Sequence, residues 1–241
     1  MKTELGYIKE VLSNPKRYEL KTPIAHIINR VPDFTSYGDA SLEAAGGFSE
    51  GNFWWHVEWP KEIKALTLKN LVVTRKCKIT NKLISINLLE FVVEIINYAA
   101  TTYLFQTHEN NYEYSTLLNW TDNKSAEAWI RKAATKTNKG KALQSILCNL
   151  MINNPVSIES KYIKGETNIL ADKISRIFSS SSSKLNFDEL FIQYPQIKEW
   201  KRFHPDQELL SSLYLALLKE QDPGLCPVKR LGHTSLDNNT L

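Results

Sequence analysis

The pattern of hydrophobic and polar positions is strand-like in the first part of the chain. After residues 1–32, where a short helical pattern is interrupted by prolines, apolar and small residues run in short stretches separated by polar or glycine-containing turns. This pattern predicts strands over 33–40, 46–50 and 52–59, with Gly46-Gly47 supplying a turn. Three strands at this spacing form an antiparallel meander.

From Ser85 onwards, apolar positions recur every three or four residues and predict helices with strands between them. Ser85 is suited to begin the first helix, in which Ile86, Leu89, Val93 and Ile96 share one face. The same rules predict strands over 114–121 and 155–163, and helices over 125–134, 141–152 and 169–178. The order indicates an α/β fold with a five-stranded mixed sheet, three antiparallel strands followed by parallel strands, flanked by helices.

The predicted elements divide the chain into a domain over 33–178 with segments on either side. The five serines at 179–183 are typical of a flexible linker. In 184–241 we expect a helical tail, which docks on the domain or on a neighbouring protein, and poorly ordered residues from 221 onwards. The tail helices are predicted over 187–200 and 205–220.

Composition is that of a globular protein. The chain has 241 residues, of which 42% are hydrophobic and 23% charged, which excludes wholesale disorder and a collagen-like or coiled-coil rod. Cys77, Cys148 and Cys226 lie far apart, so we expect neither a disulfide framework nor a zinc site. Polar residues interrupt the most apolar stretch, 83–105, which argues against a membrane span, and no secretory signal is visible. We therefore expect an intracellular protein, cytoplasmic or nuclear.

Basic residues are concentrated in two segments, although the net charge is only +4. Residues 61–82 contain seven lysines and arginines with a single acid, and residues 124–141 contain six with a single acid. Two such segments in the middle of the chain favour a polyanion-binding face, but lysines that merely solvate a surface give the same pattern.

Four carboxylates occupy positions from which they can converge at one edge of the predicted sheet. Asp39 ends the first strand, Glu90 lies in the first long helix, Asp122 follows the fourth strand, and Asp172 begins the last helix of the domain. Carboxylates without nearby histidine or cysteine suit Mg²⁺, and two such ions can hydrolyse a phosphodiester bond.

Each acid also has a structural interpretation. Asp39 can end a strand, Asp122 can cap the following helix, and Asp172 can favour a helix N-terminus. Glu90 is the exception, because a lone carboxylate in an apolar helix is costly to bury. We expect Glu94, one turn further on, to be the exposed member of that pair.

The motifs that carry these acids resemble the ribonuclease H domain of retrotransposon reverse transcriptases. They are YGDAS with a following Gly-Gly, INLLE, NWTDN and GETNILADKISR, spread over Asp33 to Phe178. The segments FWWHVEWP and FHPDQELLSSLYLALL are similar to the DIRS-like, tyrosine-recombinase branch of these elements. The resemblance implies a ribonuclease H-like fold in a part of a longer polyprotein.

The resemblance also implies an activity and a site. It implies hydrolysis of the RNA strand of an RNA·DNA hybrid, with two Mg²⁺ ions, or Mn²⁺ in their place, held by Asp39, Glu90, Asp122 and Asp172. The residues implied to contact nucleic acid are Ser41, Asn87, Asn123, Lys124, Arg131 and Asn168. The polymerase domain of the same polyprotein is the expected protein partner; no membrane partner is expected, and the oligomeric state stays open.

The chain departs from the family pattern at two places, the first of which bears on turnover and not on metal binding, and two alternative functions stay open. No histidine precedes Gly165, and the stretch 60–85 is longer than a simple connection, so that it forms either a hybrid-binding strip or a surface hairpin built from 71–74 and 78–84. A binding module without catalysis is one alternative function, although unpaired clustered carboxylates repel one another. Another nuclease of the same fold, such as an integrase or resolvase, is the second alternative.

Overall fold

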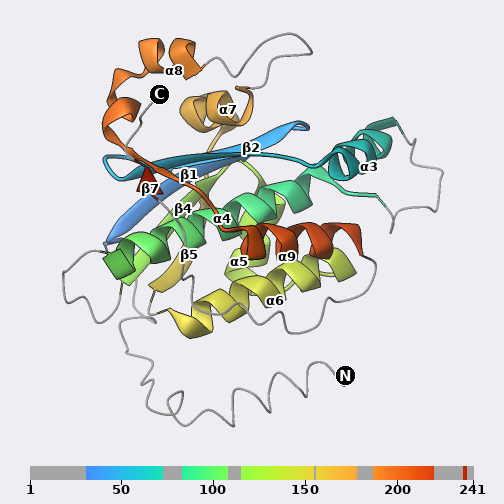
Figure 1. Cartoon of the computed structure of the whole chain (residues 1–241). Coiled ribbons are helices and arrows are strands. Elements are labelled where there is room, and N and C mark those ends of the chain that lie inside the picture. Colours follow the sequence, from blue (N-terminus) through green and yellow to red (C-terminus); the bar gives the residue numbers. More distant parts are fainter. Residues whose placement is uncertain are drawn as a thin grey trace.

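A mixed sheet of seven strands, in the order β5-β4-β1-β2-β3-β6-β7, forms the centre of the molecule (Figure 1). The computed structural model describes residues 31–72, 83–107, 115–154, 156–177, 187–219 and 236–237. The serine linker at 179–183, most of the lead-in segment 1–32 and nearly all of the chain beyond 219 lie outside these residues.

The predicted meander and the parallel strands are both present. β1 (Phe34–Ala40), β2 (Ala44–Ser49) and β3 (Phe53–Glu58) are antiparallel, β4 (Ser115–Thr121) is parallel to β1, and β5 (Val156–Tyr162) is parallel to β4. The predicted turn at Gly46-Gly47 is wrong, because both glycines lie inside β2. The turn lies instead at Ser41, whose hydroxyl accepts hydrogen bonds from the N–H groups of Glu43 and Ala44.

The sheet has more strands than the five predicted, and the additional ones come from the C-terminal part of the chain. The helix predicted over 187–200 ends at Gln193, as α8 (Phe187–Gln193), because Pro195 disfavours a helical conformation at the residue before it. After the 3-10 helix η3 (Pro195–Glu199), β6 (Lys201–Phe203) pairs in parallel with β3. β7 (Leu236–Asp237) then pairs with β6. Strands of two or three residues are too short to show an alternating pattern.

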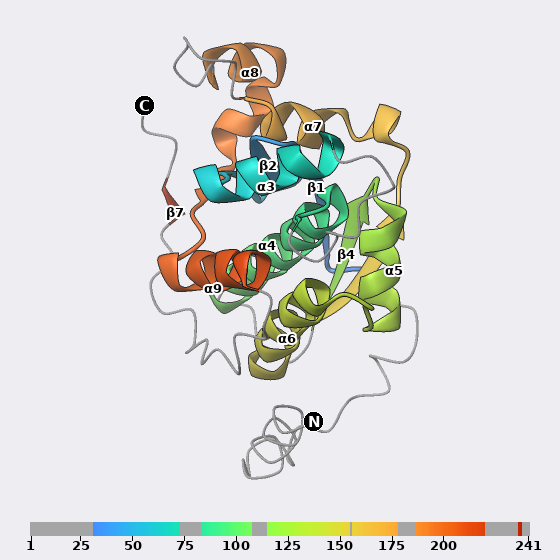
Figure 2. The ribbon, with the colours of Figure 1, turned by 90° about the vertical axis from the view of Figure 1, so that its right-hand side faces the viewer.

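Helices cover both faces of the sheet (Figures 1 and 2). On one face lie α4 (Ile86–Thr107) and, beyond it, α5 (Lys124–Lys132), α6 (Asn138–Asn153) and α9 (Gln207–Leu218). On the other face lie α7 (Ile169–Ser175) and α8. β3 separates the two cores by simple alternation: Phe53, Trp55 and Val57 belong to the core around α4, whereas Trp54 belongs to the core around α7 and α8.

The C-terminal helix docks on the domain. Leu209, Leu213 and Leu217 of α9 are fully buried in the core around α4, and α9 contacts α6 and α3 (Lys61–Val72). The ammonium group of Lys139, at the start of α6, donates a hydrogen bond to the carbonyl oxygen of Leu217. One lysine of the second basic segment is therefore buried in the fold and serves a helix end rather than a polyanion.

The first basic segment begins as a helix. α3 extends to Val72, so the hairpin predicted from Leu71 is wrong there, and the rest of that hairpin lies largely outside the described residues. Lys64 pairs with Glu43 at 2.8 Å and reaches Glu58 at 3.9 Å. This lysine neutralises acids of the protein itself.

α4 is apolar around nearly its whole circumference but carries one polar stripe. By length and composition, Ile86–Gln106 is the one described helix that passes as a membrane span, yet 89% of the relevant window is buried inside the protein. On the stripe, the amide of Asn97 accepts from the indole N–H of Trp55 at 2.7 Å and donates to Asn119 at 2.9 Å. The stripe thus joins α4 to β3 and β4.

Glu94 belongs to this buried stripe, so the prediction that it is exposed is wrong. Its side chain is 1% exposed and accepts hydrogen bonds from Asn119 at 2.6 Å and from the hydroxyl of Ser160 at 3.2 Å. Burial raises the pKa of Glu94 to about 7, against the effect of these two hydrogen bonds. Its partners lie on β4 and β5, far along the chain, and the local pattern of the helix contains no sign of them.

We expect Glu94→Gln to change how stability depends on pH. The pKa of Glu94 is raised from 4.5 in the unfolded chain to about 7, so its contribution to stability is present below pH 4.5 and is lost as pH rises towards 7. Relative to the wild type, the free energy of unfolding of the variant should therefore rise by about 3 kcal/mol between pH 4 and pH 8. Denaturant unfolding at several pH values measures this, with the exposed Glu62→Gln as control. Parallel curves for the wild type and Glu94→Gln would contradict the prediction.

Candidate metal centre

Two parallel neighbouring strands place the first two acids at one edge of the sheet. Asp39 is the penultimate residue of β1, and Asp122 directly follows β4. Because β1 and β4 are parallel, their carboxyl ends meet at the same edge. Asp39 is 4% exposed, whereas Asp122 is half-buried and faces solvent in part.

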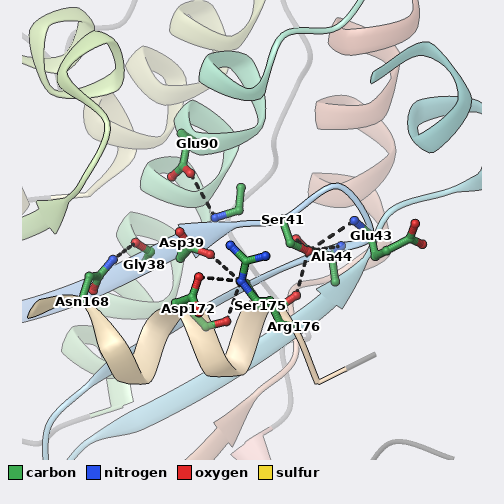
Figure 3. A network of polar contacts seen from close by, with 11 residues as sticks. Gly38, Asp39, Ser41, Glu43, Ala44, Glu90, Asn168, Asp172, Ser175 and Arg176 are labelled. Atoms are coloured by element: carbon green, nitrogen blue, oxygen red, sulfur yellow. Dashed lines mark hydrogen bonds and ion pairs between the residues drawn. The ribbon is translucent and has the colours of Figure 1, made fainter. Parts of the chain in front are cut away.

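The third acid comes from α4, the helix that packs on one face of the sheet against β1 and β4. Glu90 is 4% exposed, and its Oε1 accepts a hydrogen bond from the N–H of Ala40 at 3.2 Å (Figure 3). Its Oε2 is buried without a hydrogen-bond partner in the described part of the chain. Ligand oxygens of Asp39, Glu90 and Asp122 all lie within 4.8 Å of one another. The predicted convergence of these three acids, which we call the acid triad, is confirmed.

The fourth acid lies near the acid triad but is not part of it. Asp172, in the first turn of α7, accepts a hydrogen bond at its Oδ1 from the Nε–H of Arg176 at 2.6 Å (Figure 3). The prediction that all four carboxylates share one cluster is therefore correct for three of them. Asp172 remains close enough to raise the pKa values of Asp39 and Asp122.

α7 also holds the carboxylate of Asp39. The hydroxyl of Ser175 donates a short hydrogen bond to Asp39 Oδ2, and the carbonyl of Ser175 accepts one from the hydroxyl of Ser41 at 2.9 Å (Figure 3). Because Ser175 is fully buried, this contact is protected from water. Asp39 is thus oriented by a neutral donor before any cation binds.

The surroundings of the acid triad disfavour the ionised form of its carboxyl groups. The pKa of Asp39 is raised to about 6, chiefly by burial and also by the charges of Asp122 and Asp172, although Ser175 and Arg176 lower it. Burial, followed by the charges of Asp39 and Asp122, raises the pKa of Glu90 well above its usual range. Burial raises the pKa of Asp122 as well. Three carboxylates in such a position are costly to ionise together unless a cation joins them.

A glycine lets the loop before α7 pack against Asp122. A Cβ atom on Gly165 would lie 2.9 Å from Asp122 Oδ2, closer than ordinary van der Waals contact. The start of the 3-10 helix η2 (Gly165–Thr167) therefore lies against the carboxylate of Asp122. This close approach accounts for the glycine that opens the GETNILAD motif.

Two of the predicted nucleic-acid contacts lie together beside the acid triad. Asn123 Nδ2 donates to Asn87 Oδ1 at 2.8 Å, and Asn123 Oδ1 accepts from the N–H groups of Ser125 and Ala126. Asn123 therefore caps α5. Asp122 does not, so helix capping does not explain the presence of an acid at position 122. Asn87 is held in place but keeps its own N–H donors for a ligand.

The other predicted contacts divide into buried and exposed residues. The hydroxyl of Ser41 serves the turn after β1, and Asn168 is 2% exposed and donates to the carbonyl of Gly38 at 2.9 Å. Both side chains are buried and make hydrogen bonds within the protein, and their contact with nucleic acid stays a prediction. Lys124 and Arg131 are exposed on α5; Lys124 lies 4.9 Å over the ring of Tyr162, and Arg131 pairs with Glu127 at 2.8 Å.

The roles of two residues of α7 were missed in the sequence. Ser175 and Arg176 lie three and four residues after Asp172, and this spacing places side chains on one helix face. The spacing was available as a signal for the Asp172–Arg176 pair. The contact from Ser175 to Asp39 joins residues 136 positions apart and has no local signal.

Comparison with models of protein families, with curated proteins and with solved structures gives no match. Whether a cation suits this site is therefore judged from the ligand atoms that the acid triad offers. Carboxylate oxygens without thiolate or imidazole suit a hard cation such as Mg²⁺, and the buried unpartnered Oε2 of Glu90 lacks only a positive partner. The residues present fit such an ion.

We expect Glu90→Gln to stabilise the metal-free protein at pH 8, because an amide removes a buried charge that has two acidic neighbours. Its Oε1 can still accept from Ala40. The expected gain in unfolding free energy is about 1–3 kcal/mol; it should shrink as pH falls and vanish near pH 4.5, where the carboxyl of Glu90 is protonated in the unfolded chain as well. Denaturant unfolding in chelator measures it.

The same variant should lose most of the stabilisation that Mg²⁺ gives the wild type. Glu159→Gln, whose side chain is partly exposed and pairs with Lys161, serves as control and should respond to Mg²⁺ as the wild type does. The prediction would be contradicted if metal-free Glu90→Gln were less stable than the wild type at pH 8. The carboxylate of Glu90 would then not be destabilised by its acidic neighbours.

Proposed function

We propose that this protein is a ribonuclease H-type endonuclease that hydrolyses the RNA strand of RNA·DNA hybrids with the help of divalent cations. The observation that carries the proposal is the acid triad: three carboxylates from two parallel strand ends and a facing helix, with ligand oxygens within 4.8 Å. Two of the three residues are almost fully buried, and one buried oxygen has no partner among the described residues. Such an arrangement is costly without a cation.

The topology supports the same proposal. An antiparallel β1-β2-β3 meander, a β4 parallel to β1 and a β5 parallel to β4, with a long helix across one face, is compatible with a ribonuclease H-like fold. In that fold the acids occupy the positions that the YGDAS, INLLE and NWTDN motifs give them here. Through the same resemblance we propose the polymerase domain of a reverse transcriptase as the protein partner.

The roles of the acids follow from their surroundings. Asp39 and Asp122, from adjacent strand ends, would hold the ions together with Glu90, and Asp172 would supply a further carboxylate nearby. Bound Mg²⁺ ions would activate a water and stabilise the leaving oxygen of the phosphodiester. Ser175 keeps Asp39 oriented, and Gly165 keeps the loop against Asp122.

Recognition of the RNA strand is assigned to the residues beside the acid triad. The amide of Asn87, fixed by Asn123, can donate to a 2′-hydroxyl, the group that distinguishes RNA from DNA. The exposed Lys124 follows directly and can neutralise a backbone phosphate. Exposed Arg131, Lys132, Lys136 and Lys141 continue the positive charge along α5 and the start of α6.

The test is cleavage of a labelled RNA·DNA hybrid with and without Mg²⁺ by the wild type and Asp122→Asn. We expect the wild type to cut the RNA strand only with Mg²⁺ or Mn²⁺, and Asp122→Asn to lose at least about a hundredfold in rate, because it removes a metal ligand. Binding of the hybrid should survive the substitution. Asp188→Asn, the same chemical change at an exposed position of α8, should leave the rate unchanged.

Three results would overturn the proposal. Unchanged hydrolysis by Asp122→Asn would exclude the acid triad as the active site. Salt-sensitive binding of the hybrid without cleavage in either metal would identify a binding module instead. Preferential cleavage of duplex DNA would identify a different nuclease of this fold.

A further inference from the structure

Unlike the members of the acid triad, Asp172 forms an ion pair with a basic side chain of the protein, that of Arg176. Its Oδ1 lies 2.6 Å from Arg176 Nε, one helical turn away. In the described part of the chain, no lysine or arginine makes an ion pair with Asp39, Glu90 or Asp122. A divalent cation can therefore reach the acid triad without displacing a basic side chain, whereas a cation that binds Oδ1 of Asp172 must displace Arg176.

The backbone next to Arg176 is packed against the sheet, whereas its side chain is largely exposed. α7 packs against β1 and β2 so closely that a Cβ on Gly46 would lie 2.8 Å from the carbonyl carbon of Ile174. The carbonyl of Ser175 is held by Ser41. The side chain of Arg176, in contrast, is 62% exposed. The guanidinium can thus leave Asp172 without any change in the helix.

The charge of Arg176 acts on the whole site. Its hydrogen bond to Asp172 raises the pKa of Arg176, and the charges of Asp39 and Asp122 raise it further. The same guanidinium lowers the pKa values of Asp39 and Asp122. Its positive charge therefore opposes a second cation more strongly than it would at an ordinary surface position.

We propose that Arg176 is a positioning residue that holds Asp172 as its counter-ion until a second divalent cation displaces the guanidinium. The inference rests on the proposed metal-dependent function and adds an order of binding. The first ion binds at the acid triad, and the second binds more weakly because it must exchange Arg176 for itself at Asp172. Because exposed ion pairs are weak, this exchange is readily reversible.

Calorimetric titration with Mn²⁺, in the absence of nucleic acid, tests the order. We expect two binding events for the wild type, and in Arg176→Gln a second event that is about fivefold tighter, with the first changed by less than about twofold. Lys161→Gln is the control, because Lys161 also pairs with a carboxylate of the protein, Glu159, at 3.3 Å, and 49% of its side chain is exposed. That variant should bind Mn²⁺ like the wild type.

A second background separates competition at Asp172 from a general effect of charge. In Asp172→Asn, the further substitution Arg176→Gln should change Mn²⁺ binding by less than about twofold, because the carboxylate over which the two cations compete is gone and only the general effect of charge remains. A tightening that persists in this background, or no tightening in Arg176→Gln alone, would overturn the role of Arg176 while leaving the metal centre in place. Absence of any Mn²⁺ binding by the wild type would overturn the proposed function as well.

Discussion

The mutual repulsion of Asp39, Glu90 and Asp122 is the constraint that the fold must overcome at the edge of the sheet where β1 and β4 end. Three carboxylates within 4.8 Å cannot all be ionised in a buried place without a positive partner. The fold nevertheless holds them there by means that do not depend on charge: the parallel pairing of β1 with β4, and the packing of α4 across both strands. The stability lost at the acid triad is supplied by two large apolar cores, one on each face of the sheet.

Glu90 and Glu94 show how the same residue type acquires two roles on one helix. Both are buried on α4, one turn apart, and burial raises the pKa of each. Each oxygen of Glu94 accepts a hydrogen bond from a strand residue, so this side chain is satisfied within the protein. Glu90 keeps one buried oxygen without a partner in the described chain. A satisfied buried carboxylate contributes to the fold, whereas an unsatisfied one beside two other acids indicates a site for an external cation.

The sequence was sufficient for the features that depend on local periodicity, and insufficient for those that depend on distant partners. The bounds of β1, β3, β4 and β5 and the start of α4 were predicted within a few residues, because alternation and three- to four-residue spacing reflect burial directly. The convergence of the acid triad followed from the positions of its members near strand ends and in an apolar helix. Glu94 was misplaced because its partners, Asn119 and Ser160, come from strands that only the folded chain brings near. β6 was missed because it has three residues and is recruited by the exposed edge of β3.

α7 connects the stability of the second core to the charge of the metal centre. The helix carries Ser175, which orients Asp39, and Asp172, whose partner Arg176 caps its C-terminus, while Ala171 and Ile174 are buried in the core on this face of the sheet. The helix is too short to be stable alone, so its position depends on this packing and on the close approach that Gly46 allows. Any change that moves α7 away from the sheet must therefore move the side chains of Ser175, Asp172 and Arg176 together. Such coupling explains why apolar and charged residues are interleaved within the single short motif GETNILADKISR.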